Sequence, residues 1–115
     1  MAIDLSSVAR PSSTGGYATK RGALHADANK VVKLTTPGWA SYALVYATQS
    51  DDLTLDSWSV DTSTLSEGDA KTTNAFTWPS TSPAGLPFQL GGAVLNIAGT
   101  SGGGYLHVML FEEKP

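Results

Sequence analysis

The segment 105–111, YLHVMLF, alternates strictly and yet is apolar on both of its faces. Successive side chains of a strand point to opposite faces, so Leu106, Val108 and Leu110 share one of them. The other face is formed by Tyr105, His107, Met109 and Phe111. A strand at the rim of a small domain normally has only one apolar face. The pattern therefore predicts a second apolar cover, supplied by the N-terminal segment of the chain or by another subunit. A twisted sandwich whose two sheets cross and bury both faces of the strand is the alternative.

From residue 29 onward the sequence is a series of short strand candidates separated by turns rich in Gly, Pro, Ser and Asp. No segment has a sustained helical period. The candidates lie at 30–36, 39–49, 53–60, 73–78, 88–90, 93–99 and 105–111. This pattern predicts an all-β fold, a small antiparallel sandwich or barrel of the jelly-roll kind, over residues 29–115. Two local predictions follow: a hairpin between the strands at 39–49 and 53–60, and a β-bulge near Asp56 and Ser57.

Residues 1–28 have a different composition from the rest of the chain. They are rich in Ser, Thr, Gly and Ala and show neither a strand period nor a helical stripe. Segments with so little apolar surface are typically poorly ordered until they meet a partner. We therefore expect an extended N-terminal arm, separate from the β domain, that becomes ordered on another subunit or on a larger surface.

The charges are distributed unevenly along the chain. The net charge is −3, which gives no support for nucleic-acid binding. Basic residues prevail in 1–33, whereas 51–69 contain six acidic residues and no basic one. Such a division can orient neighbouring copies or steer the arm onto an acidic surface, with Arg10, Lys20 and Arg21 as the candidate contacts. Ordinary solvated loops are the alternative interpretation.

Residues that could carry out chemistry are few. The chain has no cysteine, and its two histidines, His25 and His107, lack the ligand spacing of a metal site. The acidic stretch 50–56 also lacks the spacing of a calcium loop. We therefore expect no cofactor, no metal and no enzymatic activity. The chain shows neither an apolar run of membrane-spanning length nor a signal-like segment after Met1, so we expect synthesis in a cytosol and no membrane partner.

The cysteine-free β domain and the small-residue arm resemble the small decoration, or cement, proteins of tailed-bacteriophage heads. The resemblance is one of overall layout, without a diagnostic motif. It implies a structural protein of the virion that forms homo-oligomers, often trimers, and binds the major capsid protein. The candidate contacts, taken from the arm and the last strand, are Arg10, Lys20, Arg21, Tyr105, His107, Met109 and Phe111.

A second hypothesis is a carbohydrate-binding sandwich, such as a lectin-like or fibre-tip domain. The chain has three tryptophans, and aromatic side chains flank the proline-rich segment 79–87. Trp78 and Phe88 are the candidate residues for stacking on a sugar. Packing in the core is the alternative role for both, because aromatic side chains supply much of the buried area of a small β domain.

Overall fold

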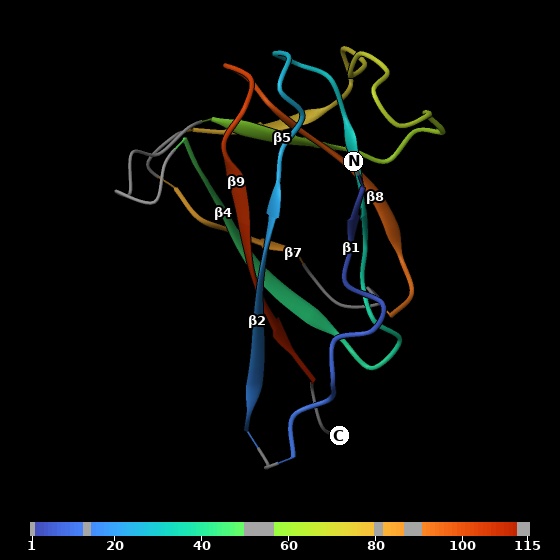
Figure 1. The fold of residues 1–115 in the computed structure, drawn as a ribbon, viewed down its shortest axis with the longest axis vertical. Helices are drawn as coiled ribbons and strands as arrows, with labels where there is room; N and C mark the ends of the chain where they lie inside the picture. Colours follow the sequence, from blue (N-terminus) through green and yellow to red (C-terminus); the bar gives the residue numbers. More distant parts are fainter. Residues whose placement is uncertain (1, 13–14, 50–56, 80–81, 87–90, 113–115) are drawn as a thin grey trace.

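The computed structural model describes residues 2–12, 15–49, 57–79, 82–86 and 91–112. These residues form strands joined by turns and contain no helix, so the predicted all-β class is confirmed. The strands are β1 (Ile3–Asp4), β2 (Tyr17–Ala23), β3 (Val32–Thr35), β4 (Tyr42–Thr48), β5 (Trp58–Asp61), β6 (Phe76–Trp78), β7 (Ala84–Leu86), β8 (Val94–Gly99) and β9 (Tyr105–Phe111) (Figure 1).

The strands form two sheets with a nested pairing order. One sheet has the order β1-β3-β8-β5-β6, and the other has the order β2-β9-β4-β7. Strand β5 pairs with β6, β4 with β7, β3 with β8 and β2 with β9, all antiparallel. This is the pairing of one long hairpin rolled up into two layers, which is the topology of a jelly roll. Because most consecutive strands lie in different sheets, residues distant in sequence become neighbours.

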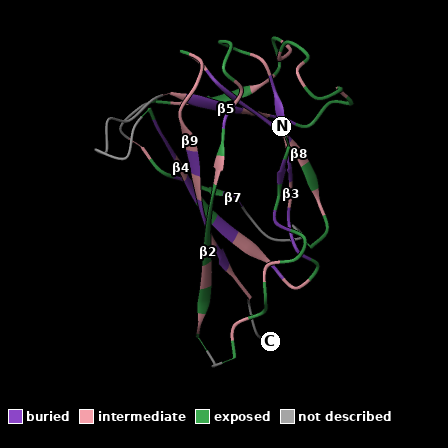
Figure 2. Cartoon of the chain, in the orientation of Figure 1, coloured by how far each residue is buried: buried purple, intermediate pink, exposed green. Residues whose placement is uncertain are grey.

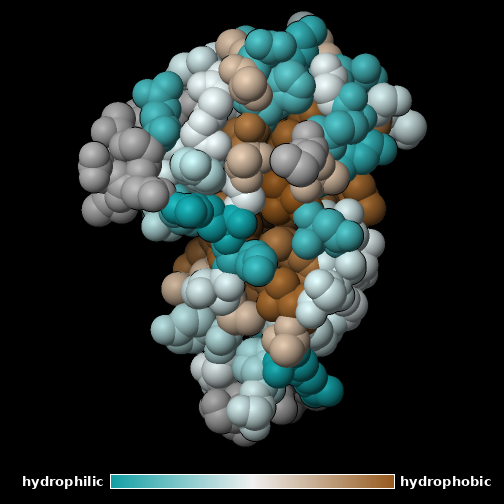
Figure 3. Space-filling view, in the orientation of Figure 1, coloured by the Kyte–Doolittle hydropathy of each residue, from teal (hydrophilic) through white to brown (hydrophobic). Residues whose placement is uncertain are grey.

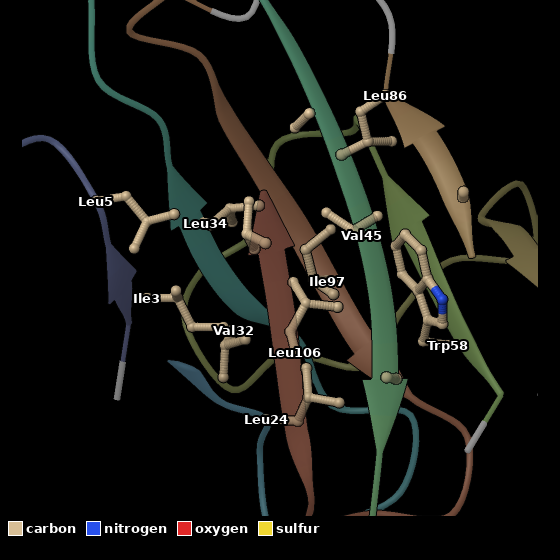
Figure 4. Packing of buried hydrophobic residues seen from close by; sticks show 14 of the residues in the cluster. Ile3, Leu5, Leu24, Val32, Leu34, Val45, Trp58, Leu86, Ile97 and Leu106 are labelled. Atoms are coloured by element: carbon tan, nitrogen blue, oxygen red, sulfur yellow. The ribbon is translucent and has the colours of Figure 1, made fainter. Parts of the chain in front are cut away.

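The core lies between the two sheets and follows the pleat of the strands. Figure 2 shows strands whose residues alternate between buried and more exposed classes, and β9 alternates along its whole length. The side chains of Leu106, Val108 and Leu110 are buried, as the alternation predicts. They pack in one apolar cluster with Trp58 and Ile97 of the facing sheet (Figure 4).

The predicted separate arm is wrong, because the described part of residues 1–28 supplies one strand to each sheet. Strand β1 pairs in parallel with β3, and β2 pairs with β9 over all seven of its residues. Ile3, Leu5 and Leu24 are buried in the core cluster, and Figure 4 shows Ile3 and Leu5 beside the side chains of β3. The indole N–H of Trp39 also donates a hydrogen bond to the carbonyl of Val8 at 2.8 Å. Residue 28 is therefore no boundary between an arm and a domain.

The predicted hairpin between the strands at 39–49 and 53–60 is also wrong. Strand β4 pairs with β9 and β7, whereas β5 pairs with β8 and β6 in the opposite sheet. Alternation along one strand shows which faces are apolar but not which strand is its neighbour. The β-bulge predicted near Asp56 and Ser57 stays a prediction, because Asp56 lies outside the described residues.

A buried carboxylate anchors the loop that follows β5. Asp61 is 3% exposed and accepts hydrogen bonds from the hydroxyl and backbone N–H of Ser63, at 2.6 and 2.9 Å, and from the backbone N–H of Thr72 at 2.8 Å. The Ser63 hydroxyl and then the two backbone donors lower the pKa of Asp61 far below its usual value, against the opposing effect of burial. The Asn96 amide donates to the Ser63 carbonyl at 2.6 Å, which fastens the same loop to β8.

Apolar side chains also reach the surface of the single chain. Figure 3 shows a group of hydrophobic side chains in the middle of one side of the molecule, bordered by hydrophilic ones. Large hydrophobic residues are exposed on both sheets: Tyr17, Leu44, Phe76 and Val94. Among the described residues there is no helix long and apolar enough to cross a membrane.

A candidate partner-binding face

The second apolar face of β9 lies at the centre of a regular array of side chains. Strand β9 runs between β2 and β4, and each of the three strands contributes four residues to the surface that points away from the core. We call this surface the outer face. Its cross-strand rows are Tyr17–Phe111–Tyr42, Thr19–Met109–Leu44, Arg21–His107–Tyr46 and Ala23–Tyr105–Thr48.

Aromatic rings form one end of the outer face. The ring of Phe111 lies 5.9 Å from that of Tyr17 and 6.0 Å from that of Tyr42, measured between centroids, and both pairs are tilted. The hydroxyl of Tyr42 extends over Gly85 of β7, where a Cβ atom would collide with it. Glycine at position 85 thus lets Tyr42 lie flat across the neighbouring strand and extends the aromatic row toward β7.

The row of Arg21, His107 and Tyr46 combines an aromatic stack with a cation. The ring of His107 stacks on Tyr46 with a centroid distance of 4.7 Å and an interplanar angle of 9°. Its Nε2 atom is hydrogen-bonded to the hydroxyl of Thr48 at 2.9 Å, which fixes the plane of the imidazole. The guanidinium of Arg21 lies 4.4 Å from the centroid of the Tyr105 ring, a cation–π arrangement. This end of the face therefore combines a guanidinium with aromatic rings.

A groove of about 670 Å³ is open on the outer face. This volume lies within the range of roughly 300–1,000 Å³ that ligand sites in proteins occupy. Most of its surface is apolar, with a few polar groups at its border. Its lining residues are Thr19, Lys20, Arg21, Leu44, Tyr46, Pro83, His107, Val108 and Met109.

The cover that the sequence predicts for the second face of β9 is not the N-terminal segment. Strand β2 lies beside β9 in the same sheet, not on top of it. In the single chain Tyr105, His107, Met109 and Phe111 are half-buried by their neighbours in the sheet. Tyr17 and Leu44 of the same face are 57% and 38% exposed. Cover by a second molecule stays a prediction.

The three predicted basic contacts do not form one patch. Arg21 lies on the outer face, whereas Lys20, paired with Val108, points to the opposite side and borders the groove from β2. Arg10 lies elsewhere and forms a two-pronged ion pair with Glu112, in which Nε donates to Oε2 at 2.6 Å. That pair joins the segment after β1 to the end of β9, so it connects parts of one chain.

Of the two candidate residues for stacking on a sugar, Trp78 lies on the other sheet. Trp78 of β6 stacks on Trp58 at 4.4 Å with an interplanar angle of 15°, and Phe76 lies 4.6 Å from Trp78. Trp58 is buried, Trp78 is half-buried and Phe76 is 63% exposed. Phe88 lies outside the described residues. The exposed ring here is therefore Phe76, which the sequence does not single out.

The outer face includes residues that the sequence did not mark as contacts. Alternation in 39–49 places Tyr42, Leu44 and Tyr46 on one face, but their position beside β9 depends on a pairing between distant segments. Tyr17 was missed because its strand looked like part of an arm.

In the described part of the chain, no three His, Cys, Asp or Glu side chains are grouped closely enough to hold a metal ion. No protein-family model, curated protein or solved structure was found that matches this chain.

Proposed function

We propose that this chain is a structural, non-enzymatic protein of a virus particle, a decoration protein that binds the major capsid protein of a phage head. The observation that carries the proposal is the outer face, on which aromatic and aliphatic side chains of three long strands remain partly exposed. Large exposed apolar patches mark sites of protein–protein interaction. The groove within the outer face is large enough to bury a side chain of a partner.

The topology of the fold supports this proposal without selecting it. Jelly rolls occur in viral capsid proteins and also in lectins. A fold alone does not determine a function, so the choice depends on the surface. The proposal includes synthesis in the host cytoplasm, a final location on the virion and self-association, with a trimer as the expected state from the family that the chain resembles.

Binding to capsid shells tests this proposal. Shells are assembled from the major capsid protein encoded in the same genome, mixed with increasing amounts of this protein and sedimented. We expect saturable co-sedimentation with a fixed number of copies per capsid subunit. Sedimentation velocity of the protein alone gives its oligomeric state. Absence of binding to the shells would refute the capsid role, and a monomer at micromolar concentration would refute the trimer.

A carbohydrate-binding function is the second candidate, and the exposed ring of Phe76 beside Trp78 favours it. Exposed aromatic rings can stack on the apolar faces of sugars, and Trp78 would report binding through its fluorescence. The test is a glycan array together with tryptophan fluorescence of the wild type and of Phe76→Ala. Binding that Phe76→Ala abolishes would support this function. An array without hits and an unchanged fluorescence would argue against it.

A further inference from the structure

We propose that the segment 2–8, which contains β1, exchanges between copies of this chain, so that Ile3 and Leu5 of one molecule occupy the same site on its neighbour. This inference rests on the self-association in the proposed function and names the contact that carries it. The site lies between β3 and Gly22 of β2, and its occupant is the chain's own first strand. A second copy carries the identical segment, so the fit of this partner to the site is shown directly.

Two buried side chains hold the segment in its site. Ile3 and Leu5 are 4% and 2% exposed, and both belong to the core cluster, beside the side chains of β3 (Figure 4). The backbone adds few bonds, because β1 pairs with β3 over only two residues at the edge of the sheet. The N–H of Leu5 donates one further hydrogen bond to the carbonyl of Thr35 at 2.8 Å. Since these partners all lie after residue 21, the same contacts form when β1 comes from another copy.

The connection from the segment to β2 permits an extended path to a neighbour. Figure 1 shows the chain leave β1, run to the end of the molecule where the C-terminus lies and turn back as β2. Val8, whose carbonyl accepts the indole N–H of Trp39, packs against the core, whereas most described residues of 9–16 are exposed. Pro11 disfavours a helical turn at the residue before it. Opening the connection breaks the ion pair of the largely exposed Arg10 with Glu112, and such pairs contribute little to stability.

Exchange conserves the core contacts, so its extent depends on how close the neighbouring copies are. A segment on a short flexible connection meets its own site at a roughly millimolar effective concentration. Copies held side by side on a capsid shell lie equally close to one another's sites, so the segment of a neighbour competes with the chain's own. Exchange of an identical element is a low-cost route to homo-oligomers, because no new complementary surface is needed. It also leaves the outer face available for the capsid protein.

An engineered disulfide distinguishes the two arrangements, because the chain has no cysteine of its own. Asp4 of β1 and Thr35 of β3 are directly paired, at a strand spacing that a disulfide can bridge. In Asp4→Cys/Thr35→Cys the bond forms within one chain if β1 stays on its own molecule, and between two chains if β1 is exchanged. The matched control is Thr35→Cys/Val94→Cys, which joins the same position of β3 to its partner on β8 and stays within one chain in either arrangement.

Both variants are oxidised on capsid shells and as free protein at roughly millimolar concentration, the range in which a neighbour's segment competes. Non-reducing gels then separate monomers from covalently linked chains, and thiol titration shows whether the disulfides have formed. We expect linked chains of Asp4→Cys/Thr35→Cys in both states, in about tenfold greater yield than with the control. The inference is wrong if this variant loses its thiols but stays monomeric, or if its thiols persist, because β1 is then not paired with β3. Shell binding with monomeric disulfides refutes the exchange and leaves the proposed function standing. Linked chains in the free protein without shell binding support the exchange and refute the capsid role.

Discussion

Ile3 of β1 packs directly on Gly22 of β2 and so joins the edges of the two sheets. A Cβ atom at position 22 would lie 2.5 Å from Cγ2 and 2.6 Å from Cγ1 of Ile3. Contacts this short force one of the two strands to move, because the branched side chain of Ile3 is stiff near its backbone. The N-terminal segment is therefore a structural part of the sandwich, and its contact with β2 gives the first prediction.

Gly22→Val should open this edge of the sandwich. The added side chain has to displace Ile3 from the core, and overpacking of this kind typically costs about 1–3 kcal/mol of the free energy of unfolding. The measurement is urea denaturation followed by circular dichroism. The matched control is Ala23→Val, because Ala23 is exposed on the outer face and has room for a larger side chain. Equal stability of Gly22→Val and the wild type would mean that β1 does not pack on β2.

Leu5→Ala tests whether the first residues belong to the core. Leu5 is 2% exposed, and removing such a side chain typically costs about 2–5 kcal/mol of stability. Ser7→Ala, at an exposed position nearby, is the control and should change little. The thermal unfolding midpoint of the three proteins decides the result. If Leu5→Ala unfolds at the same temperature as the wild type, residues 1–28 are a separate arm after all.

The two faces of β9 should respond differently to an introduced charge. Val108→Asp places a carboxylate in the buried core and should prevent folding, because an unpaired buried charge costs several kcal/mol. Phe111→Asp changes the half-buried aromatic row and should leave a folded domain whose binding to its partner is weaker. Circular dichroism and size-exclusion chromatography separate the two outcomes. A folded Val108→Asp together with an unfolded Phe111→Asp would reverse the assignment of the faces.

The stability of the protein should fall in acid because of Asp61. Its pKa in the folded state lies below the usual value of about 4 that it has in the unfolded chain. The ionised form therefore stabilises the fold above pH 4, and this contribution is lost as the pH falls from about 5 toward the folded pKa. Asp61→Asn should be less stable by about 1–3 kcal/mol at pH 7 and should lose less stability between pH 5 and pH 2.

Urea denaturation at several pH values checks the role of Asp61. Asp27→Asn is the control, because Asp27 is exposed and its carboxylate accepts no hydrogen bond in the described contacts. If Asp61→Asn and the wild type lose stability in parallel as the pH falls, the hydrogen bonds to Asp61 do not stabilise the loop.

The sequence predicts the faces of long strands but not the partners of short or polar ones. Strict alternation over seven residues in β9 correctly separated Leu106 and Val108 from the outer face. The sequence does not predict strand β2, because its polar residues Thr19, Lys20 and Arg21 give no apolar alternation. These residues suit the outermost described strand of a sheet, where charged side chains also discourage pairing with another chain.

The outer face depends on contacts between segments far apart in the sequence. Tyr17 and Tyr42 lie on either side of Phe111 only because a jelly roll brings its second, fourth and last strands together. Turn lengths and apolar periods contain no information about this order. The apolar character of the face was thus predictable, whereas its width and its groove were not.

The most direct test of the outer face as a binding surface is the affinity of two matched variants for capsid shells. Met109→Glu places a carboxylate in the groove, and Val94→Glu makes the same change at a residue of the facing sheet that is 53% exposed. Both variants are first shown to be folded by circular dichroism. We expect Val94→Glu to co-sediment with shells like the wild type and Met109→Glu to bind at least tenfold more weakly. Undiminished binding of Met109→Glu would contradict the assignment of this face.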